Sequence, residues 1–437
     1  MLTNRGGEDN LGAKIGGPKV INISFFDALR HSPKAFRMAE AGTAIKDAGK
    51  NGGLENGSGE LTTIFRERDN KVELRKKILS LLITEEMRKR LSEYRRSKAR
   101  IRMIRRELKR EKSHLEYLYY SCLQHISPVT SPIALISQIQ RSGGSLLSQL
   151  FDGHPEVHAH PHELKIGKPK KYIWPKIDLN HDFDSWFNTL FEDDIIEHFK
   201  DGYRKERKQD ETFSFLFLPS LQKKIFLKYL DLIESITLRN VFDAYMTSYF
   251  GAWLNYQNCS GHKKYITAFT ARLAMDKSSI QSFFEVYPDG RLISIIRDPK
   301  NWFPSAFRHN EHIKRDKYSN MNVALNQWRE SAMATLLNKK TYGERVCIIR
   351  FEDLIGKTEP VMRSLANFLD IEFDLSLLIP TFNRFPIKAN TSFESERHGI
   401  MKSTLARHKT LSEEDVKTID TLTGNEYEMV LDQAATF

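Results

Sequence analysis

Short apolar runs alternate with longer amphipathic stretches from about residue 128 to the end of the chain. The runs are Ile133–Ile136, Tyr265–Phe269, Leu292–Ile296 and Val346–Ile349, and each is followed by a stretch typical of a helix. Buried parallel strands are apolar throughout, because crossover helices cover both faces of their sheet. The pattern therefore predicts an α/β fold, with a parallel sheet flanked by helices.

Upstream of this domain, the segment 65–120 contains neither proline nor glycine, so we expect a long helix there. An apolar residue recurs every seven positions, a coiled-coil period, at Met87, Tyr94, Ile101, Leu108 and Leu115. The companion seam is mostly basic, with Leu91, Lys98, Arg105 and Lys112. Such a helix could pack on the protein's own body, pair with a second copy in a homo-oligomer, or lie along an anionic surface.

The first 60 residues hold 11 of the chain's 23 glycines, so ordering them would cost more entropy than their few apolar groups return. We therefore expect a mostly disordered tail over 1–62, interrupted by a short helix around 25–41. A basic, coiled-coil-like helical extension then covers 63–127, and the α/β domain covers 128–437.

The formal net charge is +11, and its distribution matters more than its size. Between residues 65 and 112 there are 19 Lys and Arg against 8 Asp and Glu, so this segment alone supplies an excess of 11. No series of interleaved aromatic residues accompanies it, and we do not expect specific nucleic-acid binding. The three cysteines are far apart, and we find neither a signal peptide nor a membrane-spanning run, which favours a cytoplasmic protein.

The first candidate site is Arg141-Ser142-Gly143-Gly144-Ser145, which joins an apolar strand to a leucine-rich helix. Its glycines allow a tight turn whose amide groups approach a ligand, and the helix N-terminus adds further donors. The two serine hydroxyls and the guanidinium complete a set that favours an anion. A nucleotide triphosphatase would carry lysine before the last hydroxyl, where Gly144 stands here. A plain strand-to-helix turn is the alternative interpretation.

A second candidate site lies in Leu292–His309. Arg297 follows an apolar strand, Asp298 and Pro299 form a turn, and Ser305 lies near the start of a helix. The carboxyl ends of parallel strands are where such folds bind ligands. Arg297 and Ser305 are therefore predicted to hold a second phosphate.

Together these residues resemble the sulfotransferase family that uses 3′-phosphoadenosine 5′-phosphosulfate (PAPS). Residues 141–145 resemble its 5′-phosphosulfate loop, which usually reads Ser-Gly-Thr-Thr after Lys or Arg, and Arg297 with Ser305 resembles its 3′-phosphate site. LFDGHPEVHAHPHEL (150–164) is similar to a stretch of bacterial and carbohydrate-type or tyrosylprotein-type members, and RFEDLIGKTEPVMRSLANFLDIEF (350–373) and NTSF (390–393) are also similar. The resemblance implies a P-loop-like fold and covers about residue 128 to the C-terminus.

The resemblance also implies transfer of a sulfuryl group from PAPS, without a metal, to a hydroxyl or amine of an acceptor, for which carbohydrate or glycolipid is our expectation. Arg141 would stabilise charge on the departing phosphate. Glu163 is the favoured base, with His160 and His162 as rivals and an exposed carboxylate as the plain alternative. A late basic segment closes over the nucleotide in relatives, which makes Arg407 and Lys409 candidates and Ser392 a weaker one. A solvated charge cluster is the plain alternative for this segment.

Two further groups of residues could contribute to function, and two other functions compete with sulfuryl transfer. His158, His160 and His162 would share one face of a strand, but no cysteine or clustered carboxylate completes a metal site in the sequence. Most aromatic residues of 165–257 are expected in the core; they are Trp174, Trp186, Phe187, Phe213, Phe215, Phe217, Tyr245, Tyr249, Phe250, Trp253 and Tyr256. The competing functions are a magnesium-dependent nucleotide kinase of P-loop type and a non-catalytic protein that binds anions through its basic helix.

Overall fold

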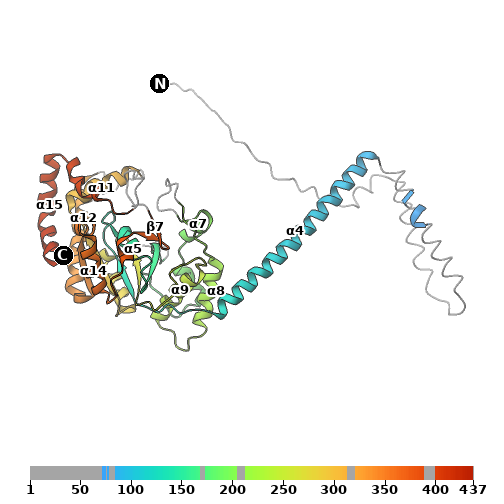
Figure 1. Cartoon of the computed structure of the whole chain (residues 1–437), viewed down its shortest axis with the longest axis horizontal. Coiled ribbons are helices and arrows are strands. Elements are labelled where there is room, and N and C mark those ends of the chain that lie inside the picture. The colour runs from blue at the N-terminus through green and yellow to red at the C-terminus, as the bar shows by residue number, and fades with distance from the viewer. Residues whose placement is uncertain are drawn as a thin grey trace, which may run out of the picture. The chain divides into compact units, whose positions relative to one another are not determined.

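The structure is a computed structural model that describes residues 71–74, 76–77, 84–167, 173–203, 212–312, 320–387 and 399–436 (Figure 1). Its strands are β1 (Ile133–Ile136), β2 (Val157–Glu163), β3 (Tyr265–Phe269), β4 (Arg291–Ile296), β5 (Val346–Arg350), β6 (Thr381–Phe382) and β7 (Phe385–Pro386). The expected glycine-rich tail, the short helix around 25–41, and the NTSF motif with Ser392 lie outside the described residues.

The α-helices are α4 (Glu85–Gln124), α5 (Gly144–Phe151), α6 (Phe183–Leu190), α7 (Asp194–Asp201), α8 (Pro219–Leu230), α9 (Leu238–Ala252), α10 (Lys277–Val286), α11 (Pro299–His312), α12 (Met321–Tyr342), α13 (Phe351–Gly356), α14 (Thr358–Phe368) and α15 (Glu413–Gln433). The 3₁₀ helices are η1 (Leu273–Met275), η2 (Gly343–Arg345), η3 (Leu375–Leu378) and η4 (Lys402–Thr410). None of the helices in the described residues is both long enough and apolar enough to cross a bilayer.

The chain divides into two compact units, 1–105 and 106–437. The predicted long basic helix is present as α4, which runs through the division. Its heptad side chains are exposed in the single chain: Met87, Tyr94, Ile101, Leu108 and Leu115. Near its end, Tyr119 is buried and its hydroxyl is hydrogen bonded to Ser220 of α8. A coiled-coil partner for the exposed positions stays a prediction.

The second unit is built on a parallel sheet with the strand order β2-β3-β1-β4-β5, which confirms the predicted α/β fold. The four predicted strands are all present, and β1 and β3 have the predicted bounds. β1 lies in the middle of the sheet, where all four of its residues are buried. A central buried strand must be apolar on both faces, which is why the unbroken run Ile133–Ile136 predicted it.

Helices cover both faces of the sheet, so that each face has its own apolar core. On one face Ile133 and Leu135 pack with residues of α8, α9, α10 and α12. On the other face Ala134 and Ile136 pack with residues of α5, α13 and α14. The aromatic residues expected in the core between 165 and 257 are buried, except Phe213, which is half-buried.

β2 was not among the predicted strands. Three histidines and a proline interrupt its apolar pattern, so hydropathy alone does not reveal it. It is one of the two edge strands of the five-stranded sheet and pairs with β3 alone. An edge position tolerates Pro161 because one side of the strand donates no ladder hydrogen bonds. This strand ends at Glu163, the residue that the sequence favoured as the catalytic base.

Candidate functional site

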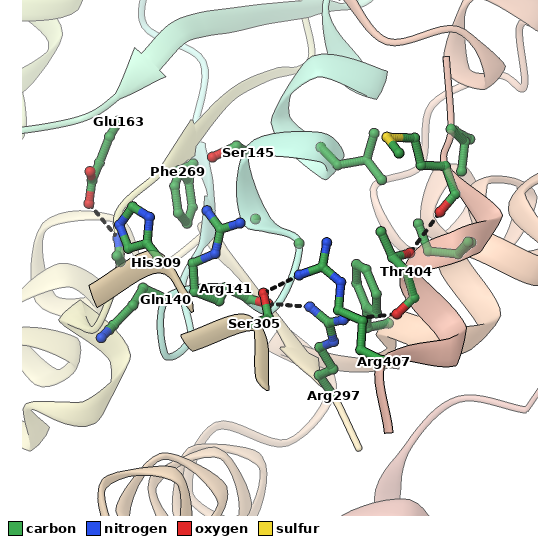
Figure 2. Close-up of a pocket in the computed structure, with 18 of the residues that line it drawn as sticks. Gln140, Arg141, Ser145, Glu163, Phe269, Arg297, Ser305, His309, Thr404 and Arg407 are labelled. Atoms are coloured by element: carbon green, nitrogen blue, oxygen red, sulfur yellow. Dashed lines mark hydrogen bonds between the residues drawn. The ribbon is translucent and has the colours of Figure 1, made fainter. Parts of the chain in front are cut away.

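A pocket of about 260 Å³ lies at the carboxyl ends of the parallel strands. Its walls come from the loop after β1, the ends of β2 and β3, the residues that follow β4 and β5, and side chains of α11 and η4. Figure 2 shows Arg141, Ser145, Glu163, Arg297, Ser305 and Arg407 around it. Residues that the sequence placed in two separate anion sites therefore border one cavity.

The loop after β1 makes the turn that the sequence predicted. Arg141 has φ 69° and Gly143 has φ 100°, so the backbone is left-handed at both positions. A Cβ atom at Gly143 would lie 2.6 Å from Phe351, and one at Gly144 would collide with Phe269 and Gln138. Only glycine lets this loop pass so close to its neighbours. The amide groups that open α5 are consequently held against the pocket.

The two serines of this loop differ in position. Ser145 lines the pocket, whereas Ser142 is buried and is not among the lining residues. The hydroxyl of Ser142 has no hydrogen-bond partner among the described residues. Its predicted contact with a ligand therefore has less support from the geometry than that of Ser145.

Arg297 follows β4 and is held rigidly at the base of the pocket. Its Nη1 donates to the Arg141 carbonyl oxygen at 2.8 Å and its Nη2 donates to the Thr404 carbonyl oxygen at 3.0 Å. The guanidinium also lies over the ring of Phe351, 4.3 Å from its centroid. The side chain is 3% exposed, and its Nε has no partner among the described residues. A guanidinium that is fixed in position and has an N–H group still available for a hydrogen bond is suited to an anionic ligand.

Ser305 and Arg407 complete this side of the pocket. Both are buried, and Nη1 of Arg407 donates to Oγ of Ser305 at 2.6 Å. η4, which carries Arg407, is tied to α11 because the His408 amide donates to Oδ1 of Asn301 at 3.1 Å. The late basic segment proposed from the sequence therefore supplies Arg407 to the pocket. Lys409 of the same segment is exposed and does not line it.

The pocket concentrates positive charge. Burial, followed by repulsion from Arg407 and Arg141, lowers the pKa of Arg297 to about 9, against an opposing effect of Glu352. Burial and repulsion from Arg141 and Arg308 likewise lower the pKa of Arg407 to about 10. Burial raises the pKa of Glu352 to about 6. This single carboxylate offsets the charge of the three guanidinium groups only in part. A polyvalent anion would relieve the repulsion among these guanidinium groups.

Glu163 lies across the pocket from Arg297, Ser305 and Arg407, next to His309 (Figure 2). Oε1 of Glu163 accepts a hydrogen bond of 3.1 Å from the Ala271 amide. Burial is the largest influence on this carboxyl group and raises its pKa. His160 and His162, the rival bases, are not among the lining residues. His309 does line the pocket, although no motif in the sequence indicated it.

Other lining residues were also missed from the sequence. Phe269 ends β3 and Phe351 follows β5, and both rings lie close to the loop 141–145. From the sequence alone, both residues are indistinguishable from ordinary core residues. Glu352 does not line the pocket, but it acts on the charge of Arg297, and its Oε1 accepts a hydrogen bond of 3.2 Å from the Asp298 amide. Its place in the Glu-Asp-Leu stretch that resembles a family motif was the signal available for it.

The profile of the sulfotransferase family matches residues 132–375, which is more than half of the chain. The chain therefore belongs to the sulfotransferase family, which confirms the resemblance described from its sequence. Enzymes of this class transfer a sulfuryl group to an acceptor. No curated protein matches the chain.

Several solved structures are similar to this one at low identity. A sulfotransferase domain from the curacin biosynthetic pathway is 18% identical, with 68% of this chain and 98% of that chain covered and a TM-score of 0.38. A sulfotransferase from Alicyclobacillus acidocaldarius is 15% identical, with coverages of 67% and 96% and a TM-score of 0.33. A mouse sulfotransferase in complex with adenosine 3′,5′-bisphosphate (PAP) is 12% identical, with 71% of this chain and 89% of that chain covered and a TM-score of 0.34. Family membership rests on the profile, because these TM-scores are low.

Proposed function

We propose that this protein transfers the sulfuryl group of PAPS to a hydroxyl or amine of an acceptor. In this reaction the bond between sulfur and the bridging phosphate oxygen breaks, and a bond between sulfur and the acceptor atom forms. Adenosine 3′,5′-bisphosphate (PAP) leaves, and the acceptor loses one proton. The protein must therefore hold a polyanionic donor, stabilise the leaving phosphate and accept a proton.

The observation that carries the proposal is the meeting of Arg141, Arg297 and Arg407 around one cavity. PAPS has a phosphate at the 3′ position and a phosphosulfate at the 5′ position, so it requires two anion sites. Arg297, Ser305 and Arg407 form one cluster, which we assign to the 3′-phosphate. The loop 141–145 forms the other, which we assign to the phosphosulfate. Ser145 and the opening amides of α5 would then stabilise charge on the leaving group, beside Arg141.

A nucleotide kinase is less well supported by the same pocket. Phosphoryl transfer by P-loop enzymes relies on a loop lysine and on magnesium held by the next hydroxyl. Gly144 occupies the lysine position, and no lysine is among the lining residues in the described part of the chain. Arginine binds phosphate in a planar fork and needs no metal to do so.

Glu163 is the base in this proposal. Its carboxylate faces the pocket opposite the arginine cluster, where an acceptor entering from that side would meet the sulfuryl group (Figure 2). Because burial raises its pKa, the carboxylate holds a proton more tightly than an exposed glutamate does. The backbone donor at Ala271 leaves the second carboxylate oxygen for the acceptor proton.

The acceptor that we propose is a carbohydrate or glycolipid. The support is the similarity of residues 150–164 to carbohydrate-type members of the family, together with the apolar residues Leu146, Phe269 and Ile400 among those that line the pocket. Apolar walls accommodate the faces of sugar rings or a lipid chain.

Sulfuryl transfer can be tested with PAPS labelled in its sulfuryl group and a panel of sugar, glycolipid, phenol and amine acceptors. We expect label to appear in one acceptor class, in step with PAP release. The same transfer should continue when magnesium is chelated. Glu163→Gln should bind PAP normally and transfer slowly. The proposal would be contradicted if PAPS gave no transfer to any class while ATP with magnesium phosphorylated one of them.

A further inference from the structure

Two histidines of β2 and one distant glutamate meet in the interior, at residues that do not line the arginine pocket. They are His160, His162 and Glu192, and their ligand-capable atoms all lie within 4.8 Å of one another. Nε2 of His160 is 3.1 Å from Oε1 of Glu192, and Nδ1 of His162 is 3.8 Å from Oε2. Glu192 is 1% exposed, so its charge requires compensation in the interior. Within the described residues, the basic side chains in close contact with this carboxylate are these two imidazoles.

The hydrogen bonds of His160 show what kind of compensation the cluster needs. Nδ1 is 2.9 Å from the carbonyl oxygen of His162, and Nε2 faces the Glu192 carboxylate. Both neighbours are acceptors, whereas a neutral imidazole has a single N–H. Either the ring is doubly protonated, or Nδ1–H donates to the carbonyl while Nε2 shares a cation with the carboxylate.

The outer contacts of the cluster match those that surround a bound metal. Metal-binding histidines commonly direct the other ring nitrogen at a backbone carbonyl or a polar side chain, and ligating carboxylates are themselves hydrogen bonded. Nε2 of His162, the nitrogen that faces away from Glu192, is 3.0 Å from the Tyr249 hydroxyl. Nδ1 of His162 lies 3.0 Å from the Glu163 carbonyl oxygen, and it would exchange this contact for the metal. Glu192 accepts hydrogen bonds from the Tyr245 hydroxyl at 3.0 Å and from the Lys165 amide at 2.9 Å.

We propose that Nε2 of His160, Nδ1 of His162 and the carboxylate of Glu192 bind a divalent transition metal, with Zn²⁺ as the best-matched ion. Two imidazoles and one carboxylate form a known zinc ligand set, in which a water fills the fourth position. Tetrahedral ligands about 2 Å from the ion lie roughly 3.4 Å apart. Because the ligand atoms here are within 4.8 Å of one another, only small side-chain movements are required. The inference is independent of sulfuryl transfer, since it concerns residues outside the arginine pocket.

The position of the site suggests a structural role. β2 is an edge strand whose pairing with β3 becomes irregular between Ala159 and Glu163, which are the residues that bracket both histidines. A metal would tie this irregular end of β2 to the segment that carries Glu192. It would thereby fix the backbone on which Glu163 reaches the pocket.

The test is metal analysis of the full-length protein after it has been stripped with a chelator and dialysed against Zn²⁺. Elemental analysis should find one zinc per chain, and Zn²⁺ should raise the thermal unfolding midpoint of the stripped protein. Glu192→Gln and His162→Ala should lose both effects. His158→Ala is the matched control, because His158 lies on the same strand but its Nδ1 is hydrogen bonded to Tyr256 at 3.0 Å, outside the cluster. Cys259→Ser controls for zinc held by this exposed thiol.

Cobalt provides a second measurement that does not depend on the folding of any variant. Co²⁺ added to the stripped native protein should give the visible absorption of a four-coordinate nitrogen and oxygen site, without a thiolate charge-transfer band. The proposal is overturned if the native chain binds neither ion. It is also overturned if Glu192→Gln remains folded and binds zinc as the native chain does, and an imidazolium–carboxylate pair then explains the cluster.

Discussion

Ser305 and Arg407 are joined by a hydrogen bond of 2.6 Å between Oγ and Nη1, although 102 residues separate them in the chain. The first comes from α11 and the second from η4, so the bond closes one wall of the pocket. Both groups are already oriented before an anion arrives, which lowers the entropy that binding must overcome. This relationship makes the C-terminal segment a component of the proposed nucleotide site.

We expect Arg407→Ala to weaken PAP binding by about 10- to 100-fold, as the loss of a charged hydrogen-bonding group generally does. Ser305→Ala should weaken it less, since the guanidinium charge remains. The matched control is Lys409→Ala, which removes an exposed positive charge two positions away. Isothermal titration with PAP measures all three. Equal losses for Arg407→Ala and Lys409→Ala would show that only the general charge of the segment matters.

Arg297→Lys should separate the fork geometry of this residue from its charge. Lysine keeps one positive charge but cannot donate to the Arg141 and Thr404 carbonyls while it also grips a phosphate. We expect PAP affinity to fall by about 10-fold or more, with little change in affinity for ADP, which has no 3′-phosphate. An equal loss for both nucleotides would contradict the assignment of Arg297 to the 3′ position.

Gly143→Ala should destabilise the protein and abolish PAP binding. The residue has φ 100°, and a Cβ there would be 2.6 Å from Phe351. Strain and collision together should lower the free energy of unfolding by roughly 1–3 kcal/mol. Gly424→Ala is the control, since its Cβ meets nothing within 4 Å. Because it lies inside α15, this change should stabilise by up to about 1 kcal/mol in denaturant titrations.

The pH dependence of transfer tests the role of Glu163. Only the deprotonated carboxylate accepts a proton, so kcat/KM should rise with pH through the pKa of this group. Because burial raises that pKa, the rise should be centred above about 4.3, the value for an exposed glutamate. Glu163→Gln should lower kcat by about 10²- to 10⁴-fold and remove this rising limb of the pH profile, while PAP affinity stays unchanged. If His309→Asn removed the limb and Glu163→Gln kept it, His309 would be the base.

The central sheet could be predicted because its strands are buried on both faces. An unbroken apolar run such as Ile133–Ile136 has few other interpretations when turn residues bound it. β2 could not be predicted in this way, because its sequence contains no unbroken apolar run. Polar side chains of this edge strand face other residues of the interior. Its three histidines are visible in the sequence, but the partner Glu192 is not, because only the fold brings it to His160 and His162.

In the candidate site, too, some residues could be predicted from local sequence and others only from the fold. Arg141–Ser145 and Arg297 stand next to strands, so the topology of a parallel sheet predicts that they share an edge. Arg407 belongs to a segment with no such rule, and sequence alone ranked it equally with Lys409. His309 was missed because its distance from Ser305, four residues along α11, becomes meaningful only when the pocket is known. Long-range pairing is what the sequence conceals.

The most direct test of the central claim is the thermal unfolding of the native protein with PAP, with ADP, and with ATP plus magnesium. If the two arginine-lined anion sites form one bisphosphate pocket, PAP should raise the unfolding midpoint most, and chelating magnesium should not alter that shift. Stabilisation by ATP with magnesium but not by PAP would contradict the account.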